Sequence, residues 1–138
     1  NHYIIFGGGR VGEHIASMLK HNRKKFIIVD KDEAVVNMLK AKRYDALMGD
    51  VLDEKVFYQT GIERAKAVIS VLGETEKNLL VTLTAKGLNP RVKVFTRSEK
   101  KELIEKLKKA GADYVVMPEF LAAEEIFGHI EKHEKTKW

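Results

Sequence analysis

Three glycines at positions 7, 9 and 12 restrict what this chain can fold into more than any other feature. They lie between a short apolar run at residues 3–6 and a segment in which Ile15 and Leu19 recur at helical spacing. In a G-x-G-x-x-G segment between a strand and a helix, Gly7 permits the tight turn, Gly9 lets a pyrophosphate approach the backbone, and Gly12 allows close helix packing. The free N–H groups and the helix dipole attract phosphate. The segment therefore predicts a turn that binds the phosphates of an adenine nucleotide.

Short apolar runs alternate with amphipathic segments along the whole chain, and this alternation predicts the fold class. The runs are residues 3–6, 26–29, 46–48, 67–72, 92–96 and 114–117. Short β-branched runs are typical of strands buried on both faces of a parallel sheet. We therefore expect an α/β fold, with a Rossmann-like, doubly wound parallel sheet of six strands in the order 3-2-1-4-5-6 and helices on both faces.

The length and charge of the chain limit its organisation and its partners. Residues 1–138 are expected to form a single domain. Because the chain begins with Asn1 and not with methionine, we expect it to be a fragment of a longer subunit. The net charge of +5 comes from cations spread over helix faces without interleaved aromatic rings, so no nucleic acid partner is expected. No apolar run approaches the roughly 20 residues that span a bilayer, so direct membrane insertion of this segment is not expected.

An aspartate at the end of the second apolar run indicates which nucleotide fits. Asp30 follows Gly12 by eighteen positions. An acidic residue there accepts hydrogen bonds from the adenosine ribose, and its charge repels a 2′-phosphate. This favours NAD, NADH, ADP, ATP or AMP over NADP. The alternative is that Asp30 caps the helix that starts near Asp32.

Two further charged residues are candidates for nucleotide contacts. Arg10 lies inside the glycine loop and could donate to a diphosphate, or it could pair with Glu13 on the surface. Asp50 follows the third strand, where an adenine ring would lie. Its alternative role is in a turn that leads into the next helix.

The segment at residues 78–88 is apolar around most of a helical circumference. Leu79, Leu80 and Leu83 can cover the sheet, while Val81 and Leu88 widen the apolar arc. A helix of this kind is buried on more than one side. We therefore expect a subunit interface and a homodimer, or alternatively a neighbouring helix of the same domain that covers the second side.

These residues together resemble a known family of regulatory domains. The chain looks like the RCK domain, also called KTN or TrkA-N, of potassium channels and transporters. The resemblance covers nearly the whole chain. It rests on the glycine loop with Arg10 and Val11, Asp30, Gly49-Asp50-Val51, Gly61-Ile62-Glu63-Arg64-Ala65, Thr75-x-x-Asn78-Leu79, Ala110-Gly111-Ala112-Asp113 and Val116-x-Pro118-Glu119.

The resemblance implies a set of nucleotide-binding residues. Those expected to contact or face the nucleotide are Gly7, Gly9, Arg10, Val11, Gly12, Asp30, Lys31, Asp50, Val51, Gly73, Thr75, Asn78 and Arg97. Arg97 could also reach the ligand of a neighbouring subunit. It stands where calcium-gated members of the family have an acidic residue, which weakens a calcium-gated interpretation. Glu119 matches a position where some members hold a divalent cation between subunits.

The resemblance also implies a function. We expect a regulatory domain, and not an enzyme, that works at the cytoplasmic face of the cell membrane. It would bind NAD/NADH, ADP, ATP or AMP and act on a potassium pore or transporter membrane subunit through rearrangement of a homodimer or a larger ring. The competing hypothesis is an NAD-dependent oxidoreductase domain that lacks its substrate domain. Such an enzyme needs an acid or base beside the nicotinamide, and no catalytic group of that kind stands out in the sequence.

Overall fold

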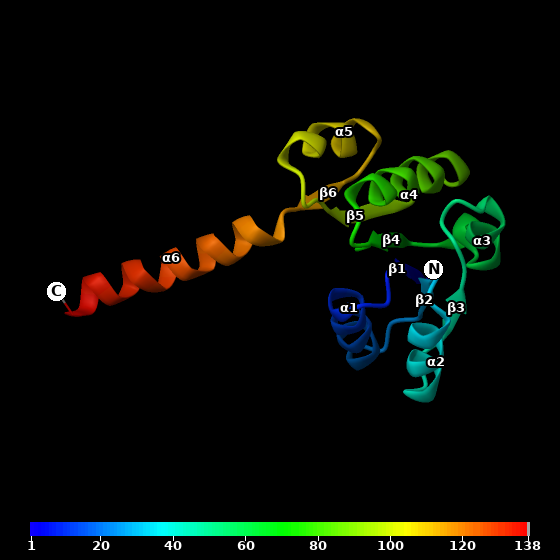
Figure 1. Ribbon diagram of the computed structural model, residues 1–138, viewed down its shortest axis with the longest axis horizontal. Helices are drawn as coiled ribbons and strands as arrows, with labels where there is room; N and C mark the ends of the chain where they lie inside the picture. Colours follow the sequence, from blue (N-terminus) through cyan, green and yellow to red (C-terminus); the bar gives the residue numbers. More distant parts are fainter. Residues whose placement is uncertain (138) are drawn as a thin grey trace.

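A six-stranded parallel sheet forms the centre of the molecule (Figure 1). The structure, a computed structural model, describes residues 1–137. The strands are β1 (Tyr3–Phe6), β2 (Phe26–Asp30), β3 (Ala46–Met48), β4 (Ala67–Ser70), β5 (Lys93–Arg97) and β6 (Tyr114–Val116). They are ordered β3-β2-β1-β4-β5-β6, and every neighbouring pair is parallel. The predicted fold class and strand order are confirmed.

Helices α1 to α5 flank the sheet on its two faces, and α6 extends away from it (Figure 1). They are α1 (Arg10–His21), α2 (Glu33–Ala41), α3 (Glu54–Gln59), α4 (Thr75–Leu88), α5 (Ile104–Lys109) and α6 (Pro118–Lys137), with short 3-10 turns η1 (Ile62–Arg64) and η2 (Lys101–Leu103). One apolar core joins alternate residues of β1 and β4 to α3 and α4, and a second joins the intervening residues to α1 and α2. Ile4 thus belongs to the first core and Ile5 to the second, as the alternation of side chains along a strand requires.

The outer strands are less buried than the sequence suggests. β4 is buried along its whole length. In β5, however, Lys93 and Phe95 are exposed while Val94 and Thr96 are buried. Phe95 pairs in register with Ile69 and Tyr114, and it is 40% exposed because it lies beyond the part of the sheet that α1 covers. The expectation of strands buried on both faces is therefore wrong for β5 and for the edge strands β3 and β6.

Helix α4 buries Val81 in place of Leu83, whereas Leu80 packs against the core as expected. Its buried residues include Val81, Thr82 and Ala85, whereas Leu83 is 52% exposed. Val81 and Ala85 belong to the same apolar core as Val68 of β4 and Val94 of β5. Leu83 is therefore the outward apolar residue, and Val81 belongs to the core. The expected subunit interface on this helix stays a prediction, carried by Leu83.

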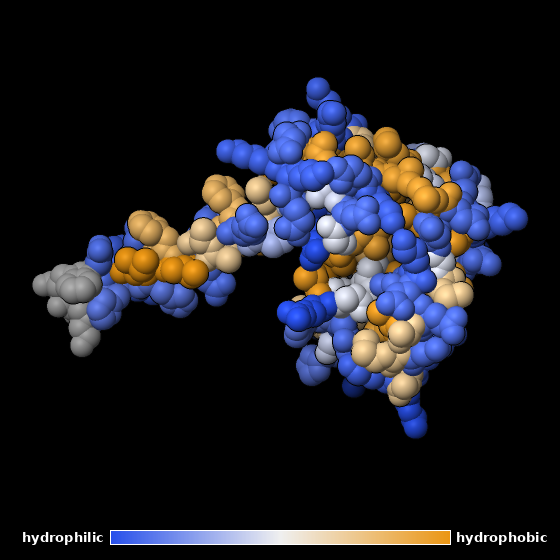
Figure 2. All heavy atoms as spheres, in the orientation of Figure 1, coloured by the Kyte–Doolittle hydropathy of each residue, from blue (hydrophilic) through white to orange (hydrophobic). Residues whose placement is uncertain are grey.

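Helix α6 leads away from the sheet (Figure 1). Figure 2 shows apolar side chains along it among polar ones. Its exposed apolar residues are Phe120, Leu121, Ile126, Phe127 and Ile130. Within residues 1–137, no helix combines the length and hydrophobicity needed to cross a membrane.

Helices α1 and α2 end in the same kind of turn, with an arginine at the position where glycine is usual. Lys24 N donates to Leu19 O at 2.9 Å, and Tyr44 N donates to Leu39 O at 3.0 Å, so each helix closes with a six-residue turn. The residue before the donor adopts a left-handed conformation, with φ of +57° at Arg23 and +67° at Arg43. Glycine is usual at this position because a side chain there is strained. Both helices therefore end on a strained arginine.

Candidate nucleotide-binding site

The glycine loop has the geometry that its sequence predicts. Gly7 has φ of +111°, which side chains rarely adopt. A Cβ at Gly12 would lie 1.7 Å from the carbonyl oxygen of Gly7, so only glycine lets α1 start this close to the turn. A Cβ at Gly9 would meet no atom within 4 Å. Gly7 and Gly12 are thus required by the fold itself, while Gly9 faces open space where a ligand can approach.

The N-terminus of α1 has no side-chain cap. Helices α2 and α3 are capped by Asp32 and Asp53, whose carboxylates accept from Ala34 N at 2.9 Å and Lys55 N at 3.0 Å. Gly9 takes the corresponding position of α1, and it has no side chain to accept a hydrogen bond. The first N–H groups of a helix have no acceptor within the helix, so those of Arg10, Val11 and Gly12 are left for a ligand. This arrangement suits an anion such as a phosphate.

Asp30 connects the end of β2 to the glycine loop. Its Oδ2 accepts from Gly8 N at 2.8 Å and its Oδ1 accepts from Asp32 N at 2.8 Å. The side-chain cap of α2 is Asp32, so the alternative role of Asp30 as that cap is wrong. A carboxylate offers about four acceptor sites. Two of them remain for ribose hydroxyls while the other two hold the loop.

Arg10 is the first residue of α1 and is exposed. Glu13, its alternative partner, instead accepts from Lys42 of the turn after α2. The pair with Glu13, the alternative role of Arg10, is therefore not formed. Lys42 can reach Glu13 because α1 and α2 pack side by side on one core. Arg10 stands at the rim of the open N-terminus, where it can turn toward a diphosphate.

A small cavity lies beside Asp30 at the carboxyl edge of the sheet. Its volume is about 190 Å³, and it is lined by Val29, Asp30, Lys31, Gly49, Asp50, Val51, Leu72, Gly73, Glu74 and Lys77. The cavity brings together five of the predicted residues, Asp30, Lys31, Asp50, Val51 and Gly73. The carboxylate of Asp50 accepts from Leu52 N at 3.0 Å, so Asp50 also stabilises the turn before α3.

Sequence reasoning missed several residues of this cavity. Leu72, Glu74 and Lys77 follow β4 and begin α4. The predicted strand order places β4 beside β1, at the point where the order of the strands reverses, and ligands of such sheets bind there. This signal could have identified the segment between β4 and α4 as part of the site.

Thr75 and Asn78 are buried in the protein and do not line the cavity. The Asn78 amide accepts from Ser70 Oγ at 2.7 Å and from Leu72 N at 3.0 Å. It donates to Leu72 O at 3.0 Å and to Arg97 O at 3.1 Å. Thr75 Oγ1 accepts from Glu99 N at 2.9 Å. Both side chains thus hold the ends of β4 and β5 in place, and their part in the site is indirect.

Arg97 and Glu119 lie apart from the cavity. The Nε of Arg97 is buried without a hydrogen bond and lies 3.4 Å from Glu99 Oε1, outside good hydrogen-bond geometry. Glu119 is exposed in the first turn of α6. Among the described residues, no group of three or more His, Cys, Asp or Glu side chains could hold a metal ion. A cation held between two subunits at Glu119 stays a prediction.

Comparison with protein families identifies the fold family. The TrkA-N domain model matches residues 3–118. The chain belongs to the TrkA-N domain family. This TrkA-N domain is 38% identical over 128 residues to Potassium channel protein 1 of Methanocaldococcus jannaschii, covering 91% of the chain and 38% of that protein. It is 32% identical over 135 residues to the Trk system potassium uptake protein TrkA homolog of Pyrococcus abyssi, covering 90% of the chain and 57% of that protein. The domain therefore spans less than two thirds of each relative.

Solved structures agree with this assignment. The TrkA-N domain of the inner membrane protein ybaL from Escherichia coli matches with a TM-score of 0.88 at 22% identity, covering 93% of this chain and 95% of that one. That match shows the fold. The GsuK channel bound to NAD matches with a TM-score of 0.83 at 28% identity, covering 99% of this chain and 24% of that one.

Proposed function

We propose that this TrkA-N domain is a regulatory domain that binds an adenine nucleotide and controls potassium flux through a channel or uptake transporter. The uncapped N-terminus of α1 carries the proposal, because its first N–H groups have no side-chain acceptor and a Cβ at the adjoining Gly9 would meet no atom within 4 Å. The structure of the GsuK channel, which this chain resembles, has been solved with NAD and also with ADP. Both ligands carry the adenosine diphosphate that this loop suits.

The nucleotide would lie across the carboxyl edge of the sheet. Its phosphates accept from the N–H groups of Arg10, Val11 and Gly12, and its ribose donates to Asp30. The adenine enters the cavity between Val51 and Gly73. Lys31 and Arg10 supply positive charge at the two ends of the ligand, and the carboxylate of Asp30 disfavours a 2′-phosphate.

Regulation requires that ligands differ in affinity between two arrangements of the subunits. Exposed Leu83 of α4 and the apolar side chains of α6 supply surfaces for a homodimer or a larger ring. Arg97 would reach a phosphate in the assembled protein, and Glu119 would hold a divalent cation there. The domain would act at the cytoplasmic face of the membrane as part of a longer subunit, and it would not be an enzyme.

Thermal unfolding with Gly9→Ala tests nucleotide binding. The added methyl meets nothing in the free protein, and Gly9 has an extended backbone with φ of −76° that alanine tolerates. The variant should therefore fold normally while the methyl blocks the approach of the phosphates. With ligand at 100 times Kd, wild type should gain about 2.7 kcal/mol, or roughly 5–12 °C in a domain of this size.

Gly87→Ala is the matched control. Its Cβ also meets nothing within 4 Å, but Gly87 lies near the end of α4, away from the loop. We expect NAD, ADP, ATP or AMP to stabilise wild type and Gly87→Ala equally, and Gly9→Ala much less. If no adenine nucleotide raises the wild-type midpoint, or if Gly9→Ala responds fully, the site is not where we place it.

A further inference from the structure

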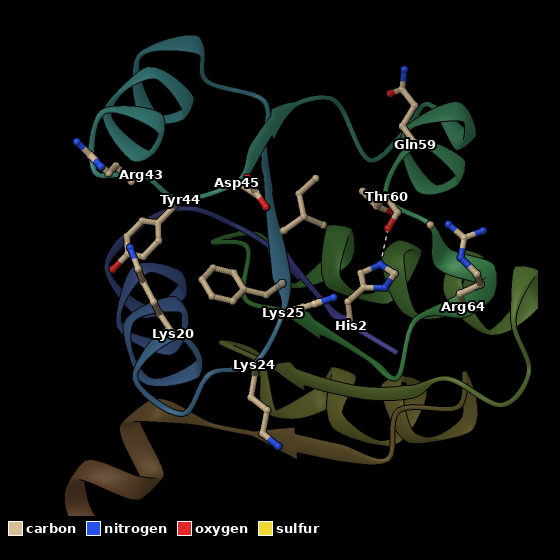
Figure 3. A pocket seen from close by; sticks show the side chains of 13 residues that line it. His2, Lys20, Lys24, Lys25, Arg43, Tyr44, Asp45, Gln59, Thr60 and Arg64 are labelled. Atoms are coloured by element: carbon tan, nitrogen blue, oxygen red, sulfur yellow. Dashed lines mark hydrogen bonds between the residues drawn. The ribbon is translucent and has the colours of Figure 1, made fainter.

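A second, larger hollow lies at the N-terminal ends of the strands, whereas the glycine loop lies at their C-terminal ends (Figure 3). Its volume is about 540 Å³. It is lined by residues that precede β1, β2 and β3, including His2, Lys25 and Tyr44. Because parallel strands begin at one edge and end at the other, this hollow and the nucleotide cavity are on opposite sides of the domain.

The rim of this hollow carries a concentration of unpaired positive charge. We define the basic rim as Lys20, Lys24, Lys25, Arg43 and Arg64. Four of them, Lys24, Lys25, Arg43 and Arg64, form no ion pair within the described residues, and Lys20 lies 5.0 Å from the ring centre of Tyr44. Asp45 is the carboxylate among the lining residues. The fold therefore gathers cations here without neutralising them.

Part of this charge has an ordinary explanation. The C-termini of α1 and α2 lie at this edge, and a helix C-terminus favours cations. That explanation does not cover Arg64, the last residue of η1, or Lys25, which immediately precedes β2.

The directions of the side chains indicate the kind of partner. Figure 3 shows Arg43, Lys24 and Arg64 pointing outward from the hollow in different directions, while Lys25 lies near its centre. Side chains that spread in this way suit an extended anionic surface, whereas a chelated small ion needs them to converge. Tyr44 is covered by Lys20 and packs against Phe26, so it is not free to stack on a base.

We propose that the basic rim docks on the anionic phospholipid head groups of a membrane. Each lysine or arginine near such a surface strengthens binding roughly fivefold. The docking orients the glycine loop away from the lipid, so nucleotide can reach its site while the domain is held at the membrane. This surface is separate from the proposed nucleotide site and does not depend on it.

Vesicle co-sedimentation of the whole chain tests the proposal. Wild type should bind phosphatidylcholine vesicles that contain phosphatidylglycerol, should not bind phosphatidylcholine alone, and should lose binding in high salt. The triple variant Lys25→Glu, Arg43→Glu, Arg64→Glu should bind at least roughly 100-fold more weakly. The thermal midpoint and the nucleotide-induced shift of this variant should stay as in wild type, which separates this proposal from the nucleotide site.

The matched control reverses three exposed lysines elsewhere. Lys55, Lys101 and Lys106 form no ion pair among the described residues, and Lys55→Glu, Lys101→Glu, Lys106→Glu gives the same change of net charge. The control should keep most of the vesicle binding. Equal loss in both variants would mean that net charge alone acts, and an absence of wild-type binding would overturn the proposal. Complete competition by inorganic pyrophosphate at matched ionic strength would make the hollow a soluble-anion site instead.

Discussion

The Asn78 side chain links the end of β4 to the end of β5. The loss of protein stability on its removal can be calculated from its hydrogen bonds. The amide forms four hydrogen bonds, to Ser70 Oγ, Leu72 N, Leu72 O and Arg97 O. It is 1% exposed, so water cannot replace these partners. A net contribution of about 1 kcal/mol for each bond means that Asn78→Ala should lower the free energy of unfolding by about 3–4 kcal/mol.

Such a loss is large for a protein whose total stability is about 5–15 kcal/mol. The thermal midpoint should fall by roughly 10–20 °C, which calorimetry measures directly. Asn37→Ala is the control, because Asn37 is exposed on α2 and should cost under about 0.5 kcal/mol.

A double-mutant cycle with Ser70→Ala separates the loss of the Ser70–Asn78 hydrogen bond from the effect of the empty space that Asn78→Ala leaves. Ser70→Ala alone should cost about 1 kcal/mol. In the Asn78→Ala background it should cost nearly nothing, because the partner is already gone. The reasoning is refuted if Asn78→Ala is no more destabilising than Asn37→Ala, or if the two costs simply add.

Three shorter predictions follow from other parts of the molecule. Burial raises the pKa of Asp113, but the hydrogen bonds from Val94 N and Lys86 Nζ outweigh it and hold the pKa below its ordinary value. Asp113→Asn should therefore cost about 1 kcal/mol at neutral pH. In urea titrations this difference should disappear as the pH falls below the ordinary aspartate range, and a constant difference would argue against the ion pair. Arg43→Gly should raise the free energy of unfolding by up to about 1 kcal/mol, because glycine tolerates the left-handed backbone there, and an unchanged urea midpoint would show that the turn is unstrained. Leu83→Glu should reduce the mass measured by light scattering if α4 forms a subunit interface, with no loss of thermal stability in the separate domain.

The sequence predicts the glycine loop because it follows from local constraints, and it predicts the sheet order because alternating strands and helices allow few parallel topologies. A run such as residues 3–6, ending at Gly7, leaves few alternatives to a buried strand and a tight turn. Gly12 is also identifiable, since its close contact with Gly7 O is part of the turn itself. The sequence does not decide which residue caps α2, because Asp30 and Asp32 both fit the pattern. The structure assigns the cap to Asp32, whose side chain accepts from Ala34 N.

Other features depend on packing between distant segments. The sequence of α4 has apolar residues on most sides, so periodicity could not show that Val81 is buried and Leu83 exposed. The Asn78 amide can form all its hydrogen bonds only because β4 and β5 end close to α4, which the sequence does not show. The basic rim joins residues that are far apart in the chain, Lys25 and Arg64 among them, and it forms because parallel strands begin at a common edge.

The uncapped start of α1 also has a consequence for the lifetime of the protein. If the proposed nucleotide supplies oxygens to the first N–H groups of α1, its binding should lower the population of open, protease-sensitive molecules. Degradation would then remove subunits fastest when adenine nucleotides are scarce. The helix end that we propose to sense a ligand would thereby also set how many copies of the domain the cell keeps.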